Sequence, residues 1–138
     1  AFGQHSGVID LNKEKFQLPR FPINEKYGEI ERFETILKTL PFPFKSIKPE
    51  DKYIGDKNNP PKVNIQFYDN IKNLKNINCF SNEEDKWRNS KINFKSSNDL
   101  DIILDGKFTT ERGRINCSLR EDSGFYRWLG IQFVIKEN

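Results

Sequence analysis

The chain has 138 residues, of which 35% are hydrophobic, and its mean hydropathy is −0.79. These values are low, but 13% aromatic residues supply large side chains for a core, which argues against a disordered chain and for a folded domain with long polar loops. The net charge of +3 comes from basic residues scattered among acidic ones, and no apolar run approaches about 18 residues, so neither a nucleic-acid-binding face nor a membrane span is indicated.

The first elements in the chain are two short extended segments. Residues 1–9 are apolar between glycines, a pattern typical of a strand end followed by a tight turn. Residues 18–23 read LPRFPI, and each proline forces its predecessor into extended geometry. Neither segment could bury itself alone, so we expect both to lie at the edge of a larger barrel.

A helix is predicted over 29–40, and prolines at 41 and 43 end it. Its apolar side chains recur at helical spacing and form one stripe. Together with the segments around Phe2 and Phe21, we expect this stripe to pack on a surface outside this chain. The members of the stripe are Ile30, Phe33, Ile36, Leu37 and Leu40.

Beyond the helix, residues 41–62 are rich in proline, which predicts an extended, irregular connection. From Val63 onward the pattern is β, with turn residues between short alternating runs. Six or seven antiparallel strands at this spacing favour an immunoglobulin-like sandwich, with a small barrel as the alternative. The strands are expected at 63–68, 76–80, 91–95, 100–104, 114–119 and 126–135.

The last of these strands has two different faces. The face expected in the core carries Leu129, Ile131, Phe133 and Ile135. The opposite face carries Tyr126, Trp128, Gln132 and Val134. Tyr126 and Trp128 are candidates for stacking against a sugar, and packing against a domain interface or the second sheet is the alternative.

Cys79 and Cys117 are the only cysteines, and both fall in predicted strands. This placement favours a disulfide between them, with two buried free thiols as the alternative. A metal pair is disfavoured because no histidine or further cysteine stands at ligand spacing. A disulfide indicates the periplasm or the exterior of a cell.

Five short words occur in order along the chain: AFGQHSG at 1–7, LPRFPI at 18–23, LPFP at 40–43, NPP at 59–61, and GRINC at 113–117 with YRWLGIQF at 126–133. The series resembles the C-terminal part of bacterial polysaccharide deacetylases, the NodB-like carbohydrate esterases. The resemblance implies that residues 1–43 end a NodB-type barrel, 44–62 form a linker, and 63–138 form an accessory β-sandwich. The chain has no Met, so we expect it to be a processed or excised product.

Deacetylation in that family implies zinc or another divalent metal held by an Asp and two His, with a catalytic Asp beside it. Because His5 is the only histidine here, we expect the metal and the catalytic groups in the parent enzyme, none bound by this chain, and no activity from this chain alone. His5 and Arg20 are the only candidates for supporting roles. Structural roles for both are the alternatives.

The resemblance therefore implies part of a bacterial, periplasmic or secreted enzyme that removes N- or O-acetyl groups from a cell-envelope or extracellular glycan. Its partners would be the N-terminal catalytic portion of the same protein and the glycan. The alternative is a free-standing secreted binding module, an adhesin or a hydrolase inhibitor. Single-stranded nucleic-acid binding has only aromatics among lysines in its favour.

Overall fold

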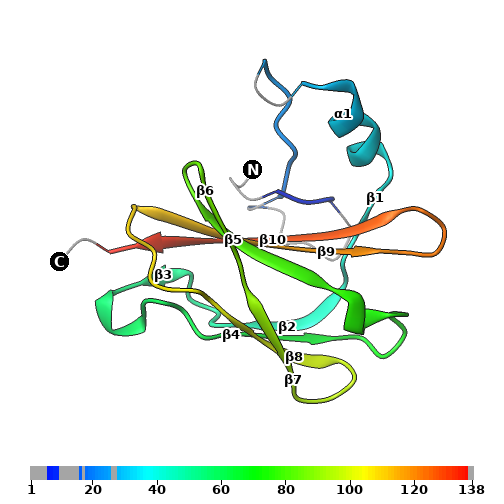
Figure 1. Cartoon of the computed structure of the whole chain (residues 1–138). Helices are drawn as coiled ribbons and strands as arrows, with labels where there is room; N and C mark the ends of the chain where they lie inside the picture. Colours follow the sequence, from blue (N-terminus) through cyan, green and yellow to red (C-terminus); the bar gives the residue numbers. More distant parts are fainter. Residues whose placement is uncertain (1–5, 10–15, 17, 26–27, 137–138) are drawn as a thin grey trace.

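The computed structural model describes residues 6–9, 16, 18–25 and 28–136, and these are mostly β. Ten strands form two sheets that face each other as a sandwich, and the described residues contain no closed barrel. The one α-helix among the described residues, α1 (Ile30–Leu37), lies outside the sandwich, above the larger sheet in Figure 1. The helix and residues 18–25 therefore share one outer face of the molecule.

The larger sheet has the strand order β1-β10-β9-β5-β6, and β3 also pairs with β10. Its centre is an antiparallel hairpin in which β9 and β10 pair from Arg120 opposite Tyr126 to Arg112 opposite Val134. Two short strands join β10 in parallel. The strands are β1 (Thr39–Pro41), β3 (Tyr53–Ile54), β5 (Asn78–Glu83), β6 (Lys86–Asn89), β9 (Arg112–Arg120) and β10 (Tyr126–Ile135).

The smaller sheet has the order β2-β4-β8-β7, with every neighbouring pair antiparallel. In β4 the buried residues alternate with polar ones, as a strand with one face in the core requires. Two 3-10 turns, Asp56–Asn58 and Leu74–Asn76, lie in the connections. The strands are β2 (Phe44–Lys48), β4 (Val63–Phe67), β7 (Lys91–Phe94) and β8 (Asp99–Ile103).

The core lies between the two sheets and is built from alternate residues of the strands. Its largest fully buried side chains are Phe42, Phe67 and Phe133, and the rings of Phe42 and Phe67 lie 4.6 Å apart. Leu129, Ile131 and Phe133 of β10 are buried, and Ile135 packs against the core. The predicted inward face of this strand is therefore confirmed.

Cys79 of β5 and Cys117 of β9 stand opposite each other and form a disulfide, with their Cα atoms 4.1 Å apart. The predicted bridge is confirmed, and the alternative of two free thiols is wrong. The bridge joins neighbouring strands of one sheet. In antibody domains the corresponding bridge links the two sheets.

All six strands expected after Val63 are present, with bounds shifted by a few residues. The prediction of an irregular connection over 41–62 is wrong, because β2 and β3 lie there and Phe42 is fully buried. The prolines stand at strand ends and between strands, where no ladder hydrogen bond is lost. Residues 39–54 thus belong to the same two sheets as the later strands.

The helix ends at Leu37, three residues before its predicted end. Thr39–Pro41 instead pair with β10 as β1, and the backbone N–H of Tyr126 donates to the carbonyl of Lys38 at 2.9 Å. The unpaired edge of β10 outweighs the helical pattern at this point. No helix among the described residues is long and apolar enough to cross a membrane.

Candidate functional site

A groove of about 540 Å³ lies on the outer face of the larger sheet. Strands β5, β6, β9 and β10 provide its floor, and α1 and residues 18–25 provide its walls. In Figure 1 residues 6–9 run directly above β10, and residues 18–25 rise from the sheet beside α1. The groove therefore combines segments that are more than 100 residues apart in the sequence.

Strand register sets the floor of the groove. Asn82 stands opposite Trp87 of β6 on one side and Arg114 of β9 on the other. Asn116, two residues beyond Arg114, therefore points to the same outer face. Its Nδ2 donates to Oδ1 of Asn82 at 3.3 Å, and both amides are buried. The floor thus presents polar amides next to an arginine and a tryptophan.

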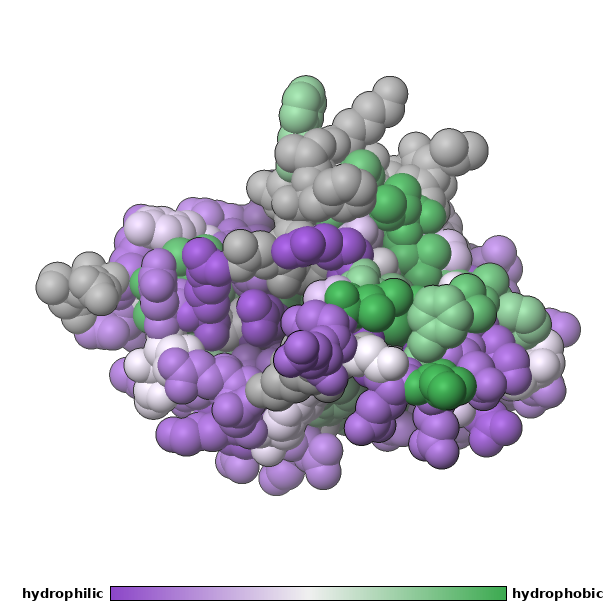
Figure 2. All heavy atoms as spheres, turned by 90° about the horizontal axis from the view of Figure 1, so that it is seen from above, coloured by the Kyte–Doolittle hydropathy of each residue, from purple (hydrophilic) through white to green (hydrophobic). Residues whose placement is uncertain are grey.

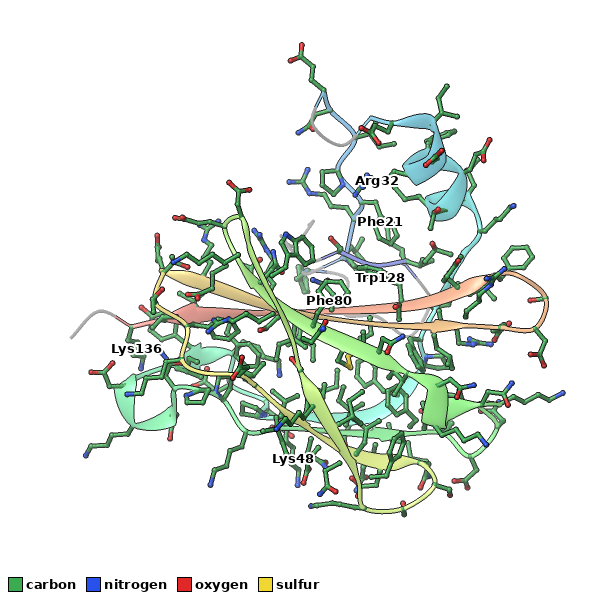
Figure 3. All side chains as sticks on the ribbon, viewed as in Figure 1. Phe21, Arg32, Lys48, Phe80, Trp128 and Lys136 are labelled. Carbon is green, nitrogen blue, oxygen red and sulfur yellow. A yellow bond between two sulfur atoms is a disulfide. The ribbon has the colours of Figure 1, made fainter. Side chains whose placement is uncertain are left out.

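Aromatic rings run from the wall of the groove down to the floor. The ring centroids of Phe21 and Trp128 lie 6.1 Å apart, and those of Trp128 and Phe80 lie 6.0 Å apart, both edge to face. Figure 3 shows Phe21, Trp128 and Phe80 in this order from the side of α1 to the sheet. Phe80 also packs at 4.9 Å against Trp87, which is 60% exposed. Trp87 therefore offers a supported aromatic surface to a ligand.

Residues 6–9 and 18–25 are held on the sheet and on α1 by close contacts. A Cβ atom on Gly130 of β10 would lie 2.2 Å from the carbonyl oxygen of Ser6, so only glycine allows this approach. Pro19 is fully buried. Nη1 of Arg32 in α1 donates to the carbonyl of Pro22 at 2.9 Å, which ties the helix to the segment. Both walls of the groove are therefore anchored.

Three arginines line the groove: Arg20 on the early segment, Arg32 on α1 and Arg114 on β9. None of the described residues that line it is acidic. Nε of Arg114 and Nε1 of Trp128 are buried donors that have no hydrogen-bond partner within the described part of the chain. The site is thus cationic, with donors in excess.

Glu83, at the end of β5, is the described carboxyl with the most unusual environment, since its side chain is only 2% exposed. It accepts hydrogen bonds from the backbone N–H groups of Thr109 and Thr110, and Arg88 Nη2 donates to it at 2.8 Å. Burial alone raises the pKa of Glu83, but the hydrogen bonds from Thr110 and Thr109 and the charge of Arg88 outweigh it, so the pKa lies below the ordinary 4.5. Because its oxygens are occupied, we assign Glu83 to holding residues 109–110 in place.

The residues selected from the sequence fall in different places. Trp128 lines the groove, and so does Arg20, whose side chain is exposed. Tyr126 is not among the lining residues, and the guanidinium of Arg120 lies 5.9 Å from the centre of its ring. His5 lies outside the described residues. Cys79 and Cys117 form the disulfide beneath the floor.

Sequence reasoning missed Trp87, Asn82, Arg114 and Asn116. A signal for the last two was present, since both alternate with buried residues in a predicted strand and so had to face outward. Trp87 had no such signal, because β6 is short and flanked by polar residues. The described residues contain no group of three or more His, Cys, Asp and Glu side chains that could hold a metal ion.

No protein family matches the sequence, and no curated protein matches it. Among solved structures, the chain is similar to the crystal structure of selenomethionine PcoC, a copper resistance protein from Escherichia coli. The TM-score is 0.47 at 13% sequence identity, and the match covers 67% of this chain and 98% of that chain. A likeness at this level supports no argument about the function of the present chain.

Proposed function

We propose that this chain binds a polysaccharide in the groove and is the accessory, non-catalytic part of a metal-dependent polysaccharide deacetylase. The enzyme would remove N- or O-acetyl groups from a cell-envelope or extracellular glycan. The groove with its exposed, supported Trp87 is the observation that carries the binding function. The enzyme class is supported by the resemblance of the five ordered sequence motifs to the C-terminal part of polysaccharide deacetylases.

The groove has the mixed chemistry that a sugar requires. A sugar ring presents an apolar C–H face and a rim of hydroxyl groups, so it is matched by an aromatic surface surrounded by donors and acceptors. Trp87 supplies the surface, and the amides of Asn82 and Asn116 line the floor next to it. A volume of about 540 Å³ accommodates a short stretch of chain.

The catalytic portion lies outside this chain in our proposal, where a metal would polarise the acetyl carbonyl and activate water. The helix offers a surface for docking to it, because Ile30, Phe33 and Leu37 are 75%, 44% and 66% exposed. Figure 2 shows hydrophobic side chains gathered on the side of the molecule where α1 lies. The boundary expected at residue 43 is wrong, because Thr39–Pro41 pair with β10 and Phe42 is buried in the core of the sandwich. We interpret only the part of 1–43 before Thr39 as the end of a NodB-type barrel, and the sandwich as immunoglobulin-like.

The disulfide supports the proposed location. Disulfides form and persist in oxidising environments such as the periplasm and the cell exterior, and are rare in the cytosol. The Cys79–Cys117 bridge is buried between β5 and β9, so it is part of the folded core. We therefore propose a periplasmic or secreted protein of a bacterium.

One observation favours the alternative of a free-standing secreted binding module. We expected the segment around Phe21 to need a surface outside this chain, and this expectation is wrong. Pro19 is buried against Gly7, and Phe21 packs on Trp128 of this chain's own sheet. An adhesin or inhibitor could therefore use the same groove without a catalytic portion.

The binding function is tested with the Trp87→Ala variant, whose exposed side chain can be removed with little risk to folding. A sugar that covers about half of the exposed indole takes on the order of 75 Å² out of water, worth about 2 kcal/mol. Calorimetric titration with acetylated and deacetylated oligosaccharides should then show affinity about 25-fold weaker than wild type.

Tyr53→Ala is the matched control, because Tyr53 is 51% exposed and does not line the groove. It should bind as the wild type does, and both variants should keep the wild-type melting temperature within a few degrees. Wild-type protein that binds no oligosaccharide, or a Trp87→Ala variant that binds as tightly as Tyr53→Ala, would refute the proposal.

A further inference from the structure

The charge of the groove indicates which glycans it can hold. Arg20, Arg32 and Arg114 come from three separate elements and line one groove of about 540 Å³. The described lining residues include no Asp or Glu, and Arg32 is already engaged with the Pro22 carbonyl, so the charge offered to a ligand is that of Arg20 and Arg114. Like charges in one concave site raise the local potential, which attracts anions and disfavours an uncharged occupant.

Arg114 is fixed in position by the sheet. It stands between Asn82 of β5 and Gln132 of β10 in the strand register, near the middle of the floor. Its Nε atom is buried and has no hydrogen-bond partner within the described residues. Buried donors are nearly always paired in proteins. Because this Nε is closed off from the surface, a ligand in the groove would meet the other N–H groups of the half-buried guanidinium.

Trp128 adds a second donor of the same kind. Its Nε1 is also buried without a partner among the described residues, and its ring is held between Phe21 and Phe80. The groove therefore offers rigid N–H donors beside fixed positive charge. A planar carboxylate suits this arrangement, because it accepts two parallel hydrogen bonds from one guanidinium.

Building on the proposed glycan binding, we infer that the groove selects an acidic glycan, one whose sugar units carry carboxylate groups. The carboxylate lies against Arg114, with Arg20 contributing charge from the wall. The neighbouring sugar face stacks on Trp87. The apolar face of the sugar and its carboxylate group therefore contact different sides of the groove.

The test compares a galacturonic acid tetrasaccharide with its fully methyl-esterified form, which has the same sugar rings without charge. Calorimetric titration should show at least tenfold tighter binding of the acid at low salt, with the difference shrinking as salt is raised. A sulfated tetrasaccharide forms a third arm and should bind more weakly than the carboxylate. Sulfated binding equal to or tighter than that of the carboxylate overturns the choice of carboxylate.

Arg114→Gln should lose most of the preference for the acid over the ester, so that its affinities for the two oligosaccharides become similar. Arg120→Gln is the matched control, since it removes one charge from the same strand outside the groove. If Arg114→Gln is poorly folded, Arg20→Gln replaces it, because the Arg20 side chain is exposed.

Equal binding of acid and ester that still depends on Trp87 overturns this inference and leaves the glycan-binding function standing. Failure of all three oligosaccharides to bind refutes both. Preference for the acid that survives in both Arg114→Gln and Arg20→Gln also overturns the inference.

Discussion

Replacing Gly130 with alanine should open the groove without disturbing the sandwich core. Gly130 faces the outer side of β10, and a Cβ atom there would lie 2.2 Å from the Ser6 carbonyl oxygen, whereas ordinary contact begins at 3.4 Å. The segment above must therefore retreat by about 1 Å, and overpacking of this kind costs about 1–3 kcal/mol.

That cost reaches the wall of the groove through Gly7, next to Ser6, because a Cβ atom on Gly7 would lie 3.1 Å from Cβ of Pro19, and Phe21, two residues after Pro19, packs on Trp128. Affinity for the glycan should fall by about 5- to 150-fold, since each 1.4 kcal/mol is a factor of about ten. Hydrogen exchange measured by mass spectrometry should become faster over residues 18–25. Thermal unfolding of the sandwich should change little.

Two other glycines provide the comparison. Gly113 faces the core, where a Cβ atom would lie 2.4 Å from the Phe108 ring, so Gly113→Ala should lower the unfolding temperature. Gly55 has nothing within 4 Å of its Cβ position, so Gly55→Ala should leave stability, exchange and binding unchanged. If Gly130→Ala keeps wild-type exchange over 18–25 and wild-type affinity, the segment does not rest on the sheet as described.

Three further predictions concern stability and partners. Glu83→Gln should lower the free energy of unfolding by about 2–4 kcal/mol at pH 7 because it removes the negative charge that pairs with Arg88, whose other hydrogen bonds go to the carbonyls of Asp105 and Lys107. The folded-state pKa of Glu83 lies below 4.5, so its carboxylate stabilises the fold above pH 4.5, and this stabilisation is lost as the pH falls through the folded-state pKa. The free energies of unfolding of wild type and variant, measured with denaturant, should therefore become equal in acid. Reducing the Cys79–Cys117 bridge, which spans 38 residues, should cost up to about 4 kcal/mol in urea unfolding, and no change on adding reductant would contradict its structural role. Phe33→Asp, which puts a charge on the exposed apolar side of α1, should weaken binding of this chain to the N-terminal portion of its parent protein in a pull-down. Glu34→Asp on the same helix should not weaken it. Equal binding of the two variants would show that α1 is not the docking surface.

The strands after Val63 were predictable because their side chains alternate with a period of two. The alternation in 126–135 also identified the core face of β10, and the cysteines in two such strands identified the disulfide. These features depend on local sequence patterns, which can be recognised in a single sequence without an alignment.

The groove was not predictable, because it depends on a hairpin that the pattern did not reveal and on register between strands far apart in the chain. Trp87 stands opposite Asn82 across the tight β5–β6 hairpin, and nothing in the sequence places Asn82 opposite Arg114. The contact of Ser6 with Gly130 and the packing of Phe21 on Trp128 are likewise tertiary contacts, and the second of them overturns the expectation that Phe21 needs an external surface. Pairing with β10 also changed the end of the helix into β1.

The central claim, glycan binding in the groove, is tested most directly by intrinsic fluorescence. The chain has only two tryptophans, Trp87 and Trp128, and both line the groove. Titration with the galacturonic acid tetrasaccharide should change the tryptophan emission with the same dissociation constant that calorimetry gives. The change should be smaller in Trp87→Ala. Calorimetric binding that leaves the emission of both tryptophans unaltered would place the glycan elsewhere and contradict the account.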